Sequence, residues 1–365
     1  MTARVLHSTL SADGNIHLSL ANVDLGDPGP DEVIVRVDAA PVNPTDIALM
    51  LSMADVARAT VSGGELVAPV PAKVLDVHAA RIGRALPIGT EGAGIVIAAG
   101  ANAQALVGKV VAAAGGGMFA THRKLPAAAV RELPPGRTAE DGASSFVNPM
   151  TALSFVETMR AEGHKAIVHT AAASNLGQML VKICAADQVP LVNVVRRAAQ
   201  VDQLRALGAK YVVDSSAPSF AADLVEAIAA TGATLAFDAI GGGSQVSQIS
   251  DAMERVAARS MTAFSHYGST TLKQAYVYGS LDRGPTTLVR TFGLAWSVGG
   301  YLVSNALRKL GAEAYGRMVK RVMSELTTTF ASAYKARIAL DQLLDPDTIR
   351  ACAAMTTGEK YLIAG

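Results

Sequence analysis

A strand–turn–helix pattern at residues 165–177 (KAIVHTAAASNLG) constrains the fold of this chain more than any other feature. An apolar run with β-branched residues is followed by a turn of small residues and by the start of a helix. A second apolar run ends in Arg196 and Arg197, and Arg196 lies 19 residues after Gly177. A strand, a tight turn and a diagnostic residue about 20 positions later form the dinucleotide-binding fingerprint. The pattern therefore predicts a parallel α/β domain that binds a dinucleotide.

The turn itself departs from the usual glycine-rich form. In G-x-G-x-x-G register it has Ala172, Ser174 and Gly177, so the last glycine alone is present. The first two positions require small side chains, because the backbone turns sharply there and approaches phosphate oxygens. Alanine and serine meet that requirement. The alternative interpretation is an ordinary strand-to-helix turn of an α/β protein.

The diagnostic position indicates which dinucleotide binds. An acidic residue there hydrogen-bonds the ribose of NAD, whereas an arginine accommodates the 2′-phosphate of NADP. Arg196 and Arg197 occupy this position, and a guanidinium can donate two parallel hydrogen bonds to a phosphate. We therefore expect NADPH as the cofactor. The alternative is a pair of solvated arginines at the start of a helix.

Composition limits the classes of protein to which the chain can belong. A chain of 365 residues, half of them hydrophobic, has material for two domain cores. The net charge of +1 and the lack of long basic runs argue against nucleic acid as a partner. There is no apolar stretch of about 18 residues and no signal-peptide core at the N-terminus, so we expect no membrane partner. Two cysteines do not suggest a disulfide framework, and Cys184 fits a buried helix position. We expect a soluble, cytoplasmic protein.

The first third of the chain is predicted to be rich in strands. Short apolar runs lie between glycine and proline turns at 33–37, 94–100 and 108–113, which favours a compact, barrel-like domain. Residues 52–86 interrupt this pattern. We expect a long loop or insertion with a short helix there, and long loops in compact domains are often functional.

From about residue 150 onward, helical and β-branched segments alternate, which predicts a doubly wound parallel sheet. Residues 296–365 then hold helix-like runs and a closing strand at 360–364. The predicted fold class is therefore α/β, with a β-rich domain plus a doubly wound parallel sheet. The expected helices of this part span residues 150–162, 175–187, 199–208, 218–230 and 244–258, and the expected strands span 165–169, 190–195, 210–213, 233–238 and 274–279.

Eight short motifs follow one another along nearly the whole chain: VNPTDI (42–47), GTEGAG (89–94), VGKVV (107–111), GMFA (117–120), VNPMTA (147–152), LGAKYVVD (207–214), DAIGG (238–242) and TGEKYL (357–362). In order and spacing they resemble the medium-chain dehydrogenase/reductase superfamily, in its zinc-free quinone oxidoreductase and enoyl reductase branch. The resemblance implies a discontinuous GroES-like catalytic domain at 1–147 and 297–365, and a Rossmann NADPH-binding domain at 148–296. It also implies an active site between the two domains and a homodimer.

The resemblance also bears on metal content and substrate. Zinc-dependent relatives place a cysteine near the Asn43 position and a histidine at the Thr90 position, and neither asparagine nor threonine is a usual zinc ligand. We therefore expect no metal. Without zinc to polarise a simple carbonyl group, hydride transfer favours quinones or alkenes conjugated to a carbonyl. The expected activity is NADPH-dependent reduction of such a small-molecule substrate.

Site residues are carried over from the matching motifs. Asn43 and Thr151 are the expected catalytic residues near the nicotinamide; the alternatives are a turn residue for Asn43 and a helix-start residue for Thr151. Backbone N–H groups of the turn are expected to bind the pyrophosphate. The expected cofactor-binding residues are Ala173, Ser174, Asn175, Leu176, Gly177, Arg196, Arg197, Ile240, Gly241, Gly242, Tyr278 and Gly279.

Two other functions stay open. Residues 193–196 also resemble enoyl-thioester reductases, so an enoyl-thioester or 2-alkenal reductase is the second hypothesis. Those enzymes carry a tyrosine shortly after the Asn-Pro-x-Asp motif, and residues 47–55 contain none. The proton donor is open, with His78, His266 and Tyr267 as candidates. The third hypothesis is an NADPH-binding protein with a structural or interaction role and little turnover.

Overall fold

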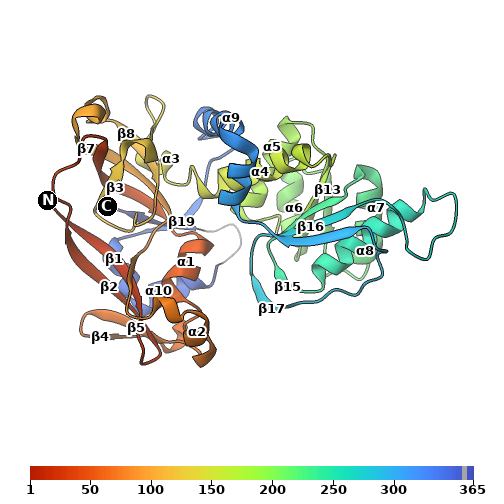
Figure 1. Cartoon of the computed structure of the whole chain (residues 1–365), viewed down its shortest axis with the longest axis horizontal. Coiled ribbons are helices and arrows are strands. Elements are labelled where there is room, and N and C mark those ends of the chain that lie inside the picture. The colour runs from red at the N-terminus through yellow and green to blue at the C-terminus, as the bar shows by residue number, and fades with distance from the viewer. Residues whose placement is uncertain (356–359) are drawn as a thin grey trace. The chain divides into compact units, whose positions relative to one another are not determined.

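The computed structural model describes residues 1–355 and 360–365 (Figure 1). Contacts divide the chain into two compact units, Met1–Val147 with Met323–Gly365, and Asn148–Val322. The predicted domain division stays a prediction, and its second boundary, between residues 296 and 297, falls inside strand β18 (Trp296–Gly300). The motif at 357–362 begins among residues 356–359, which lie outside the described part of the chain.

The first unit is a β-rich domain of mainly antiparallel strands, as the sequence predicts. One sheet has the order β4-β5-β2-β1-β6, and the other the order β10-β8-β7-β3-β20-β19, with β9 paired to β3. Leu6, Val35, Val96 and Phe119 are fully buried in the core of this unit. The strands are β1 (Thr2–Leu10), β2 (Asn15–Asp24), β3 (Glu32–Pro41), β4 (Thr60–Ser62), β5 (Glu65–Pro69), β6 (Ala85–Pro87), β7 (Glu91–Ala99), β8 (Val110–Ala114), β9 (His122–Pro126), β10 (Val130–Glu132), β19 (Tyr334–Ile338) and β20 (Lys360–Ala364), and the α-helices are α1 (Pro44–Leu51), α2 (Ala72–Val77), α3 (Ala139–Gly142) and α10 (Pro346–Ala353).

Residues 52–86 are more regular than the predicted loop. They contain the expected short helix, α2, but also a hairpin of β4 and β5, and β5 extends the sheet by pairing with β2. Gly63 and Gly64 form the two-residue turn of this hairpin, with φ of 59° and 84°. This type of turn requires positive φ at both positions, which glycine adopts without strain. All three residues of β4 are exposed, so no apolar pattern marks the hairpin in the sequence.

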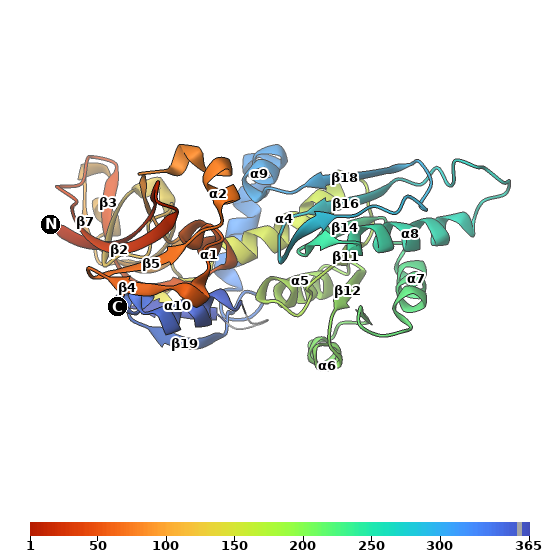
Figure 2. The ribbon, with the colours of Figure 1, turned by 90° about the horizontal axis from the view of Figure 1, so that it is seen from below.

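The second unit contains a six-stranded sheet whose neighbouring strands are all parallel, in the order β13-β12-β11-β14-β16-β18 (Figure 2). The direction of winding reverses between β11 and β14, which is the doubly wound arrangement that the alternating pattern predicts. Among the described helices, none combines the length and apolar composition that crossing a bilayer requires. The strands are β11 (Ile167–His169), β12 (Leu191–Val195), β13 (Tyr211–Asp214), β14 (Leu235–Asp238), β16 (Lys273–Val277) and β18 (Trp296–Gly300), and the helices are α4 (Val147–Ala161), α5 (Asn175–Ala186), α6 (Ala198–Ala206), α7 (Phe220–Thr231), α8 (Gln245–Ala258) and α9 (Val303–Ser324).

The sixth strand of this sheet corrects the sequence interpretation. The pattern from residue 296 onward predicts helix-like runs, yet Trp296–Gly300 pairs with β16 over five residues. Two of those five residues are glycines and none of the five is fully buried, so the segment has little β-propensity and no buried alternation. Pairing with β16, rather than local sequence, therefore defines this strand.

The segment between α8 and β16 is anchored by a buried ion pair. The Lys273 side chain is fully buried and its ammonium group contacts the Glu254 carboxylate. Glu254 also accepts hydrogen bonds from the Ser269 backbone N–H at 2.7 Å and from its hydroxyl at 2.6 Å. A buried charge requires such compensation, so these three residues fix where the long connection returns to the sheet.

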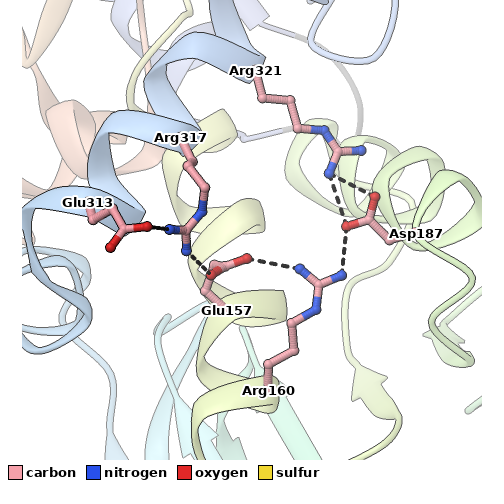
Figure 3. Close-up of polar contacts among 6 residues, drawn as sticks. All are labelled: Glu157, Arg160, Asp187, Glu313, Arg317 and Arg321. Carbon is pink, nitrogen blue, oxygen red and sulfur yellow. Dashed lines mark hydrogen bonds and ion pairs between the residues drawn. The ribbon is translucent and has the colours of Figure 1, made fainter.

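A ladder of alternating charges joins α9 to α4 and α5 (Figure 3). Two carboxylates, Glu157 and Asp187, are each shared by two arginines. Networks of this kind hold partly exposed charges in place better than isolated pairs do, so the ladder fixes α9 against both helices. The N···O distances are 2.8 Å for Arg317–Glu313, 3.5 Å for Arg317–Glu157, 2.9 Å for Arg160–Glu157, 3.0 Å for Arg160–Asp187 and 2.8 Å for Arg321–Asp187.

Candidate functional site

The turn after β11 has the geometry of a phosphate-binding loop. Ala171 adopts φ of 49°, and the chain then enters α5 with Ser174 as the N-cap. The Ser174 hydroxyl accepts a hydrogen bond from the Gly177 N–H at 3.2 Å, so serine at the second fingerprint position caps the helix. A Cβ on Gly177 would lie 2.1 Å from the carbonyl oxygen of Ala172. The remaining glycine of the fingerprint is thus the one that the backbone requires.

Several of the predicted backbone donors lie at the start of α5. Asn175 and Leu176 are its first two residues, so their N–H groups have no partner within the helix and point out of its N-terminal end. Ala173 is buried immediately before the cap. The Ser174 N–H instead donates to the carbonyl oxygen of Ala171 at 3.0 Å. Helix N-termini attract anions, and binding of a pyrophosphate by these groups stays a prediction.

Both diagnostic arginines follow β12 directly and are exposed. Arg197 is the N-cap residue of α6, and the backbone N–H of Arg196 donates to the Gln200 side chain at 3.1 Å. Neither guanidinium has a side-chain partner within residues 1–355 and 360–365. Two unpaired cations at this position are suited to a 2′-phosphate.

A hydrogen-bonded pair fixes the two central strands where the direction of winding reverses. The Thr170 hydroxyl, just after β11, donates to the Asp238 carboxylate at the end of β14 at 2.7 Å. Asp238 also accepts from the N–H of Gly241 at 2.7 Å, and the Ala239 N–H donates to the Thr170 hydroxyl at 2.8 Å. Ligands of open parallel sheets bind beside this reversal. The sequence interpretation assigned neither Thr170 nor Asp238, although Asp238 opens the DAIGG motif.

The structure brings the predicted residues after β14 and β16 together. A Cβ on Gly279 would lie 2.5 Å from the carbonyl oxygen of Ala239, so the two backbones pass in close contact. Gly241 has φ of 84°, and a Cβ on Gly242 would lie 2.6 Å from Asp282. Ile240 lies in the same tight loop and is half-buried. This part of the sheet edge therefore depends on small residues, as the sequence predicts.

Tyr278 forms a buried pair that was not predicted. Its hydroxyl lies 2.8 Å from Nε2 of His169, the last residue of β11, and the two rings stack. Burial lowers the pKa of His169 to about 3 and raises the pKa of Tyr278. Both side chains are therefore neutral at ordinary pH. The hydroxyl of Tyr278 is engaged by His169, which limits its use as a proton donor.

In the first unit, Asn43 belongs to a buried polar cluster. It is fully buried as the N-cap residue of α1, and its backbone N–H donates to Asp46 at 2.9 Å. The other oxygen of Asp46 accepts from the Thr90 N–H at 2.8 Å and from its hydroxyl at 2.6 Å. Burial raises the pKa of Asp46, and these hydrogen bonds oppose that shift. Asp46 and Thr90 thereby hold the backbone on which Asn43 sits.

Glu91 connects this cluster to the end of the first unit. One carboxylate oxygen accepts from the Asn43 side-chain amide at 3.0 Å, and the other accepts from the backbone N–H groups of Phe146 and Val147 at 2.7 and 3.0 Å. Burial raises the pKa of Glu91, and the positive charge of buried Lys360 opposes that shift. Burial in turn lowers the pKa of Lys360. Neither residue was predicted, although Glu91 lies in the GTEGAG motif.

Thr151 lies in the second unit, buried in α4, where its carbonyl oxygen accepts from the Ser154 hydroxyl at 2.8 Å. Its predicted role beside a nicotinamide stays a prediction, as does that of Asn43. Of the proton-donor candidates, His266 and Tyr267 are exposed, with their rings 3.8 Å apart and tilted by 43°, and His78 is the C-cap residue of α2. Across the described residues, no group of three His, Cys, Asp or Glu side chains is placed to hold a metal ion.

Comparison with curated proteins finds distant relatives. The mitochondrial enoyl-[acyl-carrier-protein] reductases of Mus musculus and Xenopus tropicalis are both 29% identical, over 204 and 207 residues. The matched segments make up 54% of this chain but 48% and 51% of the two relatives, so the chain spans about half the length of these enzymes. No protein-family model matches the chain.

Comparison with solved structures finds matches over the full chain. A Mesorhizobium loti protein provisionally named an NADPH:quinone reductase is 24% identical with a TM-score of 0.72, covering 100% of this chain and 98% of that one. A mutant form of the enoyl thioester reductase of Candida tropicalis is 20% identical with a TM-score of 0.69, and both chains are covered completely. A complex with NADP and crotonyl-CoA matches equally completely, at 20% identity and a TM-score of 0.68. These likenesses establish the fold.

Proposed function

From a medium-chain dehydrogenase/reductase fold of the quinone oxidoreductase and enoyl reductase branch, we propose that this chain is a zinc-independent, NADPH-dependent reductase. It transfers hydride to a quinone or to an α,β-unsaturated carbonyl compound. The observation that carries the proposal is the nucleotide-binding edge of the second unit. There the N-terminus of α5, capped by Ser174, follows the turn after β11, and two unpaired arginines follow the neighbouring strand.

Different residues of this edge would bind different parts of the cofactor. Arg196 and Arg197 would hold the 2′-phosphate, and the N–H groups at the start of α5 would hold the pyrophosphate. Bound NADPH supplies the hydride. The glycines at 241 and 279 let two backbone segments pass in close contact at this edge, beside the reversal where ligands of open parallel sheets bind.

The substrate class follows from the charge that the reaction creates. Hydride addition to a quinone or a conjugated alkene places negative charge on a carbonyl oxygen, which a proton then neutralises. Tyr278 and His169 are bound to each other and neutral, and α1 carries no tyrosine. Solvent can protonate a reduced quinone, so the leading substrate class needs no dedicated buried acid.

A second candidate is reduction of enoyl thioesters. The curated relatives are named enoyl-[acyl-carrier-protein] reductases, and one similar structure was solved with NADP and crotonyl-CoA. The absence of a tyrosine from residues 44–55 counts against this candidate. We keep it because an enoyl thioester is also an alkene conjugated to a carbonyl, and the same hydride chemistry applies.

The experiment that tests the proposal is an assay of NADPH oxidation by the purified, metal-stripped protein. It compares 1,4-benzoquinone with crotonyl-CoA and NADPH with NADH. Turnover of the quinone with a preference for NADPH supports the leading function, and turnover of crotonyl-CoA alone selects the second. Tight NADPH binding without turnover of either substrate contradicts both and leaves a binding protein. Sedimentation of the same sample tests the homodimer that the resemblance implies.

A further inference from the structure

We propose that Glu91 is a positioning residue for Asn43: it turns the Asn43 amide so that Oδ1 accepts a hydrogen bond from a donor group of the cofactor or substrate. The inference rests on the proposed reductase function and on the expectation, carried over from the motif at 42–47, that Asn43 acts near the nicotinamide. It adds the kind of group that Asn43 recognises. That group carries an N–H or O–H, such as a carboxamide or a hydroxyl.

The carboxylate of Glu91 fixes the orientation of the Asn43 side-chain amide. Asn43 faces a carboxylate oxygen of Glu91 at 3.0 Å. An ionised carboxylate only accepts hydrogen bonds, whereas an asparagine side chain has one accepting and one donating end. The NH2 group of Asn43 must therefore face Glu91, and its Oδ1 must face away.

Glu91 is itself held rigidly by hydrogen bonds. Its other carboxylate oxygen accepts two backbone N–H groups, from Phe146 and Val147, and Val147 is the first residue of α4. Charge-assisted hydrogen bonds at a helix start are strong, and the positive charge of Lys360 also attracts the carboxylate. Glu91 is therefore held at both oxygens and cannot turn away from Asn43.

Among the described residues, the Oδ1 atom of Asn43 is an unsatisfied hydrogen-bond acceptor. Oδ1 of Asn43 is buried and has no hydrogen-bond partner in the described part of the chain. Leaving a buried acceptor unpaired is unfavourable, and nearly all such groups in proteins are paired. Because the NH2 end is already bound, a group that enters this cluster can pair only by donating to Oδ1.

The consequence is a restriction on what Asn43 does. An accepting Oδ1 repels the negative oxygen that develops on a reduced substrate. Asn43 therefore binds and orients a donor group, and the charge on the substrate oxygen must be stabilised elsewhere. This role for Asn43 differs from that of an oxyanion donor, and it depends entirely on the carboxylate at position 91.

The test exchanges the two functional groups. In Glu91→Gln the new amide must direct its oxygen toward the N–H groups of Phe146 and Val147, so its NH2 faces Asn43. Asn43 then turns and presents NH2 to the ligand, and two donors oppose each other. In Asn43→Asp two carboxylates face each other. The double variant Asn43→Asp/Glu91→Gln restores every hydrogen bond and again presents an accepting oxygen.

We would measure the Kd of NADPH by fluorescence, and kcat and KM with 1,4-benzoquinone. Each single variant should raise the Kd of NADPH or the KM of the quinone about tenfold or more, and the double variant should recover most of that loss. Glu132→Gln is the matched control, because Glu132 is partly exposed in the same unit and pairs with Lys109. It should leave all constants unchanged.

Thermal melting of each variant separates folding from positioning. Should Glu91→Gln fail to fold, the double variant is compared with Asn43→Ala, which removes the acceptor and leaves Glu91 in place; the double variant must bind more tightly. Wild-type constants in Glu91→Gln, or a double variant no better than the singles, overturn the inference. A wild-type protein that neither binds NADPH nor turns over the quinone overturns the proposed function instead.

Discussion

The two units prepare their predicted sites by opposite means. The nucleotide-binding edge of the second unit is made mainly of backbone groups and small residues, with the Asp238 carboxylate bound to Thr170 and two exposed arginines beside them. The Asn43 cluster of the first unit is made of buried side chains, and it includes the ionisable groups of Glu91 and Lys360, whose mutual attraction opposes the cost of burying them. The first kind of site depends on shape, and the second on a balance of charge.

This difference determines which substitutions each site tolerates. The fingerprint lacks two of its three glycines without losing its geometry, because alanine and serine are small enough at those positions. The residues that bind Glu91 are less tolerant of substitution, because a buried carboxylate that loses its hydrogen bonds is strongly unfavourable. Substitutions at Lys360, at Arg196 and Arg197, at Gly177 and at His169 test this difference.

The largest expected effect is on the charge balance of the first unit. Lys360→Met removes the buried cation whose charge opposes the burial penalty of Glu91 and Asp46. We expect a loss of about 3–5 kcal/mol in the free energy of unfolding, because buried carboxylates that lose their compensating charge are strongly destabilising. Urea denaturation measures it. The control, Lys109→Met on the surface, should stay within about 0.5 kcal/mol. Equal losses would mean that charge balance is not what stabilises this cluster.

The next effect concerns the exposed charges of the second unit. Changing Arg196 and Arg197 together to Ala should weaken the binding of NADPH by about 1.5–3 kcal/mol for each charged hydrogen bond lost. The binding of NADH should hardly change. The free energy of unfolding should stay nearly constant, because neither side chain is buried. Fluorescence titration with both cofactors measures the difference, and Arg205→Ala in α6 is the control. Equal weakening of NADPH and NADH binding would contradict the assignment of these arginines to the 2′-phosphate.

The contrast between the two sites also explains what the sequence could and could not predict. The turn at 165–177 is local: its strand, small residues and cap lie within 13 positions, so spacing alone indicates it. The Glu91 contacts join residues 48, 55 and 56 positions apart, and no periodic pattern reports such pairs. For the same reason β18 was missed, because pairing with β16 and not local propensity makes it a strand.

A third effect tests the dependence on shape directly. Gly177→Ala places a methyl group against the Ala172 backbone oxygen, which cannot move without opening the turn. We expect a loss of about 1–3 kcal/mol in stability together with weakened NADPH binding. Gly316→Ala in α9 is the matched control, since nothing lies within 4 Å of the added Cβ. It should stabilise the helix by about 0.5–1 kcal/mol. Unchanged NADPH binding in Gly177→Ala would contradict the loop assignment.

The smallest effect tests whether the buried pair of His169 and Tyr278 is neutral. Burial lowers the pKa of His169 to about 3, below the unfolded value of about 6.5. Between these two values the unfolded chain binds the extra proton, so stability falls as the pH falls and is constant above about 6.5. From pH 7.5 to 5.5 this amounts to about 1.4 kcal/mol for one histidine. His169→Gln keeps a polar partner for Tyr278 but does not titrate, so urea denaturation of wild type and variant at both pH values isolates the effect of His169. An identical pH dependence in the two proteins would mean that His169 takes up a proton within the fold. A charged His169 beside the nucleotide-binding edge would weaken the contrast between this edge and the Asn43 cluster.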